Sequence, residues 1–171
     1  MKKKKVILGI SVLLVALIVI GVFVIQQPQE KVIIKFLSDL YTVTDYKFIN
    51  NLKNTTDVEQ VIINASAPYK DLFTEKGLDQ ILSNRIPTVY NSLAQEFNSK
   101  FYVDKINLNK KTKVDNDTFQ YFFEVFINVN NDGEKVINQK GIIVIKKVNS
   151  IWKIDFLKIL NPQDIRQILK Q

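Results

Sequence analysis

The stretch TFQYFFEVFINVN, Thr118 to Asn130, decides the fold, because its side chains alternate without interruption. One set of alternate positions is entirely apolar, and the other mixes aromatic and polar side chains: Phe119, Tyr121, Phe123, Val125, Ile127 and Val129 against Gln120, Phe122, Glu124, Phe126 and Asn128. Successive side chains of a strand point to opposite faces of its sheet. The stretch therefore predicts a long strand with one face in the core and the other partly apolar.

Shorter alternating runs on both sides of this strand predict an antiparallel meander of about four strands. The loop Asn130-Asn131-Asp132-Gly133 has hairpin composition, and Asn149-Ser150 has that of a tight turn. The other strands are predicted over Phe101 to Leu108, Val136 to Lys147 and Ile151 to Leu160, and the polar cluster Asn109 to Asp117 ends the first of them. Asn161-Pro162 then begins a short terminal helix.

Helical spacing dominates the chain before the strands. The residues Val32, Ile33, Phe36, Leu37, Leu40 and Tyr41 form one stripe, which predicts a helix from Glu30 to about Val43. Further helices are predicted over Lys47 to Lys53, from Asp57 to Pro68, and from Thr74 to Phe97, the last with a kink near Ser83 caused by Pro87. Helices first and strands second is the order of an α+β domain, in which helices on one face of a curved sheet would enclose a cone.

The N-terminal segment VILGISVLLVALIVIGVFVI, Val6 to Ile25, has twenty residues and no charge. As a helix it measures about 30 Å, the thickness of a bilayer's hydrocarbon core. Lys2, Lys3, Lys4 and Lys5 precede it, and lysines on the short side of a membrane segment hold that side in the cytoplasm. We therefore expect a cytoplasmic tail at 1–5, a transmembrane helix at 6–25, a linker at 26–30 and an extracytoplasmic domain at 31–171.

A cleaved signal peptide is the alternative to a retained anchor. The apolar run is longer than the usual signal core of about 7 to 15 residues, and no A-x-A-like site follows it. The length and the exit sequence favour a single-pass anchor in the cell membrane.

Composition excludes several kinds of chemistry. Cysteine and histidine are absent, so thiol nucleophiles, disulfides, thiolate metal sites and histidine bases cannot occur. The net charge of +7 falls to +3 without the four N-terminal lysines, with 20 basic and 17 acidic side chains remaining. We expect no nucleic-acid partner, cofactor or metal. The bias toward Lys, Asn and Ile, with two arginines, suggests a low-GC Gram-positive bacterium.

No catalytic residue is assigned, and the candidate cavity-lining residues are Tyr121, Glu124 and Trp152. Glu124 would have its pKa raised if Phe122 and Phe126, its neighbours on the same strand face, excluded water from it. The competing interpretation is that this face meets water. Other carboxylates and phenols that could act as acid or base are Asp45, Tyr46 and Asp155, the last with its side chain expected in solvent.

The predicted arrangement resembles the nuclear transport factor 2-like superfamily over residues 30 to 160. The residues that carry the resemblance are KVIIKFLSDLYTV, FTEKGLDQILSNR, TFQYFFEVFINVN, GIIVIKKV and SIWKIDFLKI, which includes Trp152-Lys153-Ile154. The resemblance implies helices packed on a curved antiparallel sheet. The layout of tail, single crossing and outer domain is also similar to the bitopic adaptor subunit of conjugation and type IV secretion machines, which implies a scaffold rather than an enzyme.

The functional expectation is a membrane-anchored protein-interaction or assembly component of a cell-envelope machine. Its partners would be the lipid bilayer and other envelope proteins, with self-association as a further possibility. The alternative is a cavity-type binding module for a small apolar or cell-wall-derived ligand.

Overall fold

The computed structural model describes residues 27–44, 58–130, 135–160 and 165–170. The predicted membrane segment Val6 to Ile25 and the predicted helix Lys47 to Lys53 lie outside these ranges. So do residues 131–133 of the predicted hairpin loop and Asn161-Pro162, the predicted start of the terminal helix. Among the described residues, no helix combines the length and the apolar character needed to span a bilayer.

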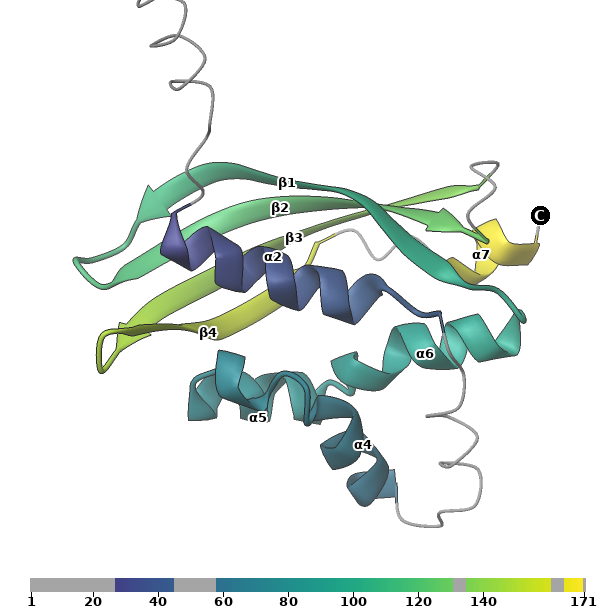
Figure 1. Ribbon diagram of the computed structural model, residues 1–171, viewed down its shortest axis with the longest axis horizontal. Coiled ribbons are helices and arrows are strands. Elements are labelled where there is room, and N and C mark those ends of the chain that lie inside the picture. Colours follow the sequence, from purple (N-terminus) through teal and green to yellow (C-terminus); the bar gives the residue numbers. More distant parts are fainter. Residues whose placement is uncertain (1–26, 45–57, 131–134, 161–164, 171) are drawn as a thin grey trace, which may run out of the picture.

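Four antiparallel strands form one sheet in the order β1-β2-β3-β4, so the predicted meander is confirmed. The strands are β1 (Phe101–Lys113), β2 (Thr118–Val129), β3 (Val136–Val148) and β4 (Ile151–Ile159). The sheet is strongly curved (Figure 1). β1 runs five residues beyond its predicted end at Leu108, because a register shift between Asn109 and Thr112 lets it stay paired with β2 through the polar cluster.

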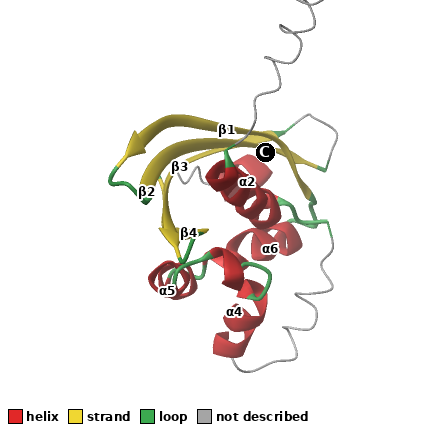
Figure 2. Ribbon diagram, turned by 60° about the vertical axis from the view of Figure 1, so that its left-hand side comes forward, coloured by secondary structure: helices red, strands yellow, loops and turns green. Residues whose placement is uncertain are grey.

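The alternation of β2 is confirmed by burial. Its inner side chains Tyr121, Phe123, Val125 and Ile127 are at most 2% exposed, whereas the residues between them are partly exposed. Figure 2 shows that α2, α4, α5 and α6 lie on the concave side of the sheet. The inner face of β2 therefore belongs to the core, and its outer face is the convex surface of the molecule.

The described helices are α2 (Pro28–Tyr41), α4 (Val58–Ser66), the short 3-10 helix η1 (Lys70–Leu72), α5 (Glu75–Ser83), α6 (Ile86–Glu96) and α7 (Ile165–Lys170). α2 confirms the first predicted helix and begins two residues earlier, so it takes over part of the expected linker. Pro28 suits a first turn, because the N–H that it lacks would have no helical partner there. The carboxylate of Glu30 accepts a hydrogen bond from the Gln27 N–H at 3.3 Å.

The single kinked helix predicted from Thr74 to Phe97 is wrong, because the chain forms two helices there. Arg85 separates them with φ 54°, in the left-handed region. Proline inside a helix removes a hydrogen bond and clashes with the preceding turn, whereas in the first turn it costs little. The break before Ile86 places Pro87 in the first turn of α6.

Helix α5 covers the outer edge of the sheet at β4. Gln80 replaces a neighbouring strand there: its side chain donates to the Leu157 carbonyl at 2.7 Å and accepts from the Leu157 N–H at 3.0 Å. Gly77 lets the helix approach, since a Cβ at this position would lie 2.5 Å from the Ile154 carbonyl oxygen. The edge strand thus has backbone partners that discourage pairing with another chain.

Strict alternation along β4 predicts the wrong position for the side chain of Asp155. Asp155 is the extra residue where the pairing of β3 with β4 shifts between Val144 and Ile145, so it does not share the solvent face with Lys153 as expected. Its side chain is 21% exposed, accepts a hydrogen bond from the Thr74 hydroxyl at 2.8 Å and lies 3.6 Å from the Lys76 ammonium. Thr74 in turn accepts from the Gly77 N–H, so Asp155 supports the N-cap of α5.

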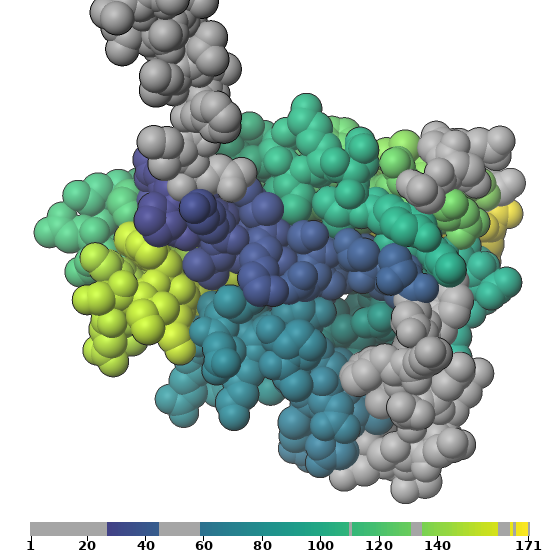
Figure 3. Space-filling model, viewed as in Figure 1, coloured from purple at the N-terminus to yellow at the C-terminus, as the bar shows by residue number. Residues whose placement is uncertain are grey.

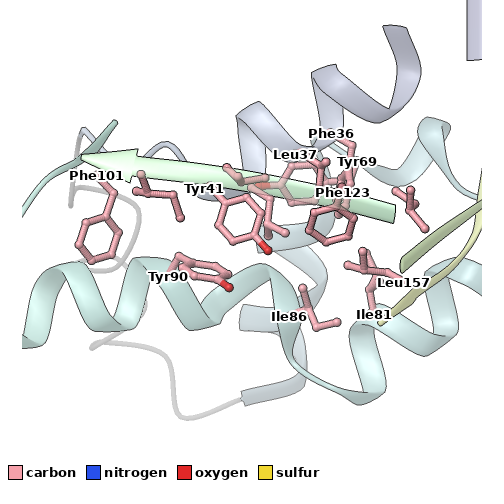
Figure 4. Packing of buried hydrophobic residues seen from close by; sticks show 14 of the residues in the cluster. Phe36, Leu37, Tyr41, Tyr69, Ile81, Ile86, Tyr90, Phe101, Phe123 and Leu157 are labelled. Carbon is pink, nitrogen blue, oxygen red and sulfur yellow. The ribbon is translucent and has the colours of Figure 1, made fainter. Parts of the chain in front are cut away.

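The core fills the space between α2, α5, α6 and the concave face of the sheet (Figure 4). Phe36 is fully buried there and makes edge contacts with Tyr69 and Phe73, with ring centroids 5.5 Å and 4.9 Å apart. Gly141 leaves room for the ring of Phe123 on the neighbouring strand, which a Cβ would approach to 2.3 Å.

Candidate functional site

Three polar side chains from three different elements meet inside the core. Tyr41 ends α2, Tyr90 lies on α6, and Gln139 lies on the inner face of β3; all are at most 3% exposed. The two tyrosine rings pack edge to face with centroids 4.5 Å apart (Figure 4). The Tyr90 hydroxyl donates to the side-chain oxygen of Gln139 at 3.3 Å. We call Tyr41, Tyr90 and Gln139 the inner polar cluster.

The Tyr41 hydroxyl is the unsatisfied member of the inner polar cluster. It lies near the Tyr90 hydroxyl without hydrogen-bond geometry and has no partner among the described residues. A buried hydroxyl without a partner costs free energy, so its presence requires an explanation.

Burial keeps both phenols of this cluster protonated. It raises the pKa of Tyr41 to about 12 and the pKa of Tyr90 well above 10. At neutral pH the cluster can therefore donate hydrogen bonds, and neither phenol is poised to act as a general base.

Tyr121 lies on the inner face of β2 beside the first turn of α2. Its hydroxyl donates to the Glu30 carboxylate at 3.4 Å, and burial raises its pKa to about 12. The Lys111 ammonium lies 5.8 Å from the centroid of the Tyr121 ring and 4.3 Å from that of Phe119. Lys111 also donates to the side-chain oxygen of Gln27, the first described residue. Tyr121 thus ties β2 to the start of α2.

Glu124 lies on the opposite face of β2, on the convex surface. Its carboxylate accepts from the Asn138 amide at 2.9 Å and pairs with the Lys140 ammonium at 3.0 Å. These two partners, Asn138 first, hold the pKa of Glu124 below its ordinary value of 4.5. Of the two interpretations of this strand face, the structure supports the one in which the face meets water, because the carboxylate has hydrogen-bond donors on the neighbouring strand and its pKa is lowered rather than raised.

Trp152 lies near the start of β4, partly buried against Phe119 with ring centroids 5.6 Å apart. The Lys147 ammonium is 5.9 Å from its ring centroid. Tyr121 and Trp152 thus lie toward one end of the sheet while Glu124 occupies its outer face, so the three candidate residues do not form one site. Asp45 and Tyr46 lie outside the described residues.

The inner polar cluster is not among the sites that the sequence predicts. One signal was available: Gln139 interrupts the apolar inner face of β3 between Ile137 and Gly141. A buried amide in a core strand needs a partner, but the sequence does not show that Tyr90 supplies it.

The described residues offer limited means of holding a small ligand or a metal. No group of three acidic side chains among them lies close enough to bind a metal ion. A depression of about 230 Å³ opens between β2 and β3 beside Glu124, Lys140 and Leu160. Sites for drug-sized ligands usually measure about 300 to 1,000 Å³, so this depression is small for one.

Comparison with known proteins gives few matches. No family model matches the chain. No curated protein matches it either. One solved structure that does match is an NTF2-like protein with a cystatin-like fold from Novosphingobium aromaticivorans, with a TM-score of 0.37 and 9% sequence identity. The match covers 72% of this chain and 92% of that one.

Proposed function

We propose that this chain is a membrane-anchored, extracytoplasmic assembly component of a cell-envelope machine, with a conjugation or secretion adaptor as its most concrete form. Its outer domain would be a cone of the nuclear transport factor 2-like kind. The order of helices followed by a four-stranded meander, and the helices on the concave side alone, support that fold.

The observation that carries the proposal is the convex face of the sheet. Large apolar side chains lie side by side there, partly exposed and with no described helix over them: Phe122, Phe126, Ile142, Val144 and Phe156. The register places Phe122 opposite Ile142 and Val144 opposite Phe156, so the apolar positions are continuous across three strands. Extended exposed apolar patches mark interaction sites in soluble domains.

The surroundings of this patch match the anatomy of a protein interface. The Glu124–Lys140 ion pair and Asn138 lie beside the apolar residues, and Lys158 faces Ile142 across the strand pair. An apolar centre with a polar rim is how protein interfaces are built. Another envelope protein is therefore the partner that we propose for the convex face.

Photo-crosslinking in the cell membrane tests this function. A photoreactive amino acid replaces Ile142 on the convex face, and a matched variant carries it at Ser92, an exposed position on α6. We expect the first variant to crosslink to a discrete envelope protein and the second to give no such product. Ile142→Lys should abolish recovery of that partner while leaving the far-ultraviolet circular dichroism unchanged.

Two results would count against an assembly role. Equal crosslinking from positions 142 and 92 would show that the convex face has no specific partner. A product formed only with a second copy of the chain would assign this face to self-association and remove the evidence for a heterologous machine.

A cavity-type binding module is the second candidate function, and the inner polar cluster favours it. The unpaired Tyr41 hydroxyl could donate to a ligand oxygen that reaches the core. Native mass spectrometry of the full chain tests this idea. A bound small molecule that is lost in Tyr41→Phe supports a binding module, and an unliganded mass for the native chain argues against one.

A further inference from the structure

We propose that one end of the sheet, formed by the β1–β2 and β3–β4 hairpins, rests on an anionic lipid surface and orients the domain on the membrane. This inference rests on the anchor in the proposed function and adds a second membrane contact, made by the folded domain itself. We call this surface the hairpin end and define it by Lys111, Lys113, Val114, Lys146, Lys147, Ile151 and Lys153.

Exposed apolar residues at the two hairpin tips are the first observation. Val114 follows the last residue of β1 and is 61% exposed; Ile151 begins β4 and is 60% exposed. These are the two most exposed large apolar side chains of the described residues. The tips are neighbours, because the Lys147 N–H donates to the Asp117 carbonyl at 2.7 Å between the hairpins. Two adjacent apolar tips can enter a lipid headgroup layer together.

The lysines around these tips are the second observation. Lys146 and Lys153 are direct partners across β3 and β4, and like charges in that position repel. No acidic side chain of the described chain forms an ion pair with any of the five lysines. Asp115 and Asp117 are the acidic residues of the hairpin tip, and α2 brings Glu30 to this end. The positive charge therefore exceeds the negative, as an anionic surface requires.

The start of the described chain lies at this same end, which is the third observation. Lys111 of the hairpin end hydrogen-bonds to Gln27, two residues after the apolar run Val6 to Ile25 closes. An extended chain covers at most about 3.6 Å per residue, so a membrane anchor ending at Ile25 holds Pro28 within about 11 Å of the hydrocarbon edge. Figure 3 shows the start of α2 on the same side of the molecule as the tips of both hairpins. An anchor that ends at Ile25 would therefore keep the hairpin end close to the lipid headgroups.

Anionic phospholipid matches both the apolar tips and the lysines of the hairpin end. Apolar tips that insert between headgroups, with lysines behind them at phosphate level, are the combination that peripheral membrane contacts use. Trp152 lies beneath the tips against Phe119, so part of the site is itself aromatic.

Because the chain has no cysteine, a fluorophore can be attached to a single introduced cysteine without side reactions. Val114→Cys and Ile151→Cys, each in the full chain, would carry one polarity-sensitive fluorophore, with Val89→Cys on α6 as the matched control. The labelled chains are reconstituted in vesicles of phosphatidylcholine alone or with about 30% phosphatidylglycerol. We expect quenching by headgroup spin-labelled lipid at positions 114 and 151 to exceed that at position 89 at least threefold in the anionic vesicles. About 1 M salt should reverse most of this difference, because at that concentration charges more than about 3 Å apart are screened from each other.

Charge variants separate the hairpin end from the rest of the basic surface. Replacing Lys146, Lys147 and Lys153 by Gln should remove most of the quenching at position 114. Replacing Lys70, Lys100 and Lys105, three exposed lysines elsewhere, should leave it unchanged.

Three outcomes would overturn the inference. Quenching at positions 114 and 151 no greater than at 89, in a chain that resists carbonate extraction, would leave the anchor in place and remove the second contact. A chain that carbonate extracts would overturn both the anchor and this contact. A fluorophore that responds to soluble anionic wall polymer and not to vesicles would assign the hairpin end to a polymer.

Discussion

Tyr41 and Tyr90 pack against each other in the core, but only the Tyr90 hydroxyl has a hydrogen-bond partner among the described residues. Replacing each tyrosine by phenylalanine should therefore change stability in opposite directions. Tyr41→Phe removes a buried hydroxyl without a partner, so we expect the free energy of unfolding to rise by about 1 kcal/mol. Tyr90→Phe leaves the Gln139 oxygen without its donor and should cost about 1 to 3 kcal/mol. Urea unfolding of the full chain in detergent measures both. A stability loss in Tyr41→Phe would mean that its hydroxyl has a partner.

The ionisation of Glu124 depends on its two neighbours on β3. We expect its pKa, measured by nuclear magnetic resonance of the carboxyl carbon, to lie below 4.5 and to rise toward that value in Lys140→Met. Because the folded state lowers this pKa, the interaction stabilises the protein above pH 4.5 and is lost as the pH falls through the folded value. Lys158→Met serves as the control, because Lys158 lies on β4 on the same face of the sheet as Glu124. It should leave the pKa of Glu124 unchanged. A pKa above 4.5 in the native chain would contradict this arrangement.

Among the elements, α5 depends on one glycine for its contact with the sheet. In an exposed helix, replacing glycine by alanine stabilises the helix by about 1 kcal/mol. At Gly77, however, the added Cβ would lie 2.5 Å from the backbone oxygen of Ile154. The helix would have to move off β4 and strain the Gln80 and Thr74 bonds, so we expect Gly77→Ala to destabilise by about 1 to 3 kcal/mol. Ser83→Ala, exposed on the same helix, should change stability by less than about 0.5 kcal/mol. Thermal unfolding distinguishes the two, and equal effects would show that α5 has room to shift.

Periodicity predicts the elements whose environment is uniform along their length. α2 and β2 each bury one continuous face, so the sequence shows them within two residues of their observed ends. Where the backbone departs from regular geometry, periodicity fails. Arg85 in the left-handed region divides one apolar stripe between two helices, and the shift in pairing at Asp155 turns that side chain toward α5.

At the scale of the whole molecule, sequence reasoning could place single candidates but not bring them together. Tyr121 and Glu124 are three residues apart and therefore lie on opposite faces, as the alternation itself requires. The inner polar cluster joins Tyr41, Tyr90 and Gln139, from α2, α6 and β3, and each of its three pairs lies 49 or more residues apart in the sequence. That convergence depends on tertiary packing, which periodicity does not contain.

The buried tyrosines predict how the whole domain responds to alkali. Burial raises the pKa of Tyr41, Tyr69 and Tyr121 to about 12, compared with about 10 in the unfolded chain. Between these values the unfolded state releases protons that the folded state keeps, so stability is fully present below pH 10 and falls as the pH rises toward 12. Tyr41 and Tyr69, whose hydroxyls are the more deeply buried, each contribute about 1 to 3 kcal/mol to this loss, and Tyr121 contributes less because solvent screens its hydroxyl.

Urea midpoints of the full chain in detergent at pH 9 to 11.5 measure this loss, with phenolate absorbance read in parallel. We expect phenolate formation by these tyrosines to coincide with unfolding rather than to precede it. Tyr41→Phe should reduce the slope of stability against pH, because it removes one of the titrating groups. Full phenolate absorbance at pH 10.5 in the folded chain would show that water reaches the tyrosines, and the packed core described above would then be wrong.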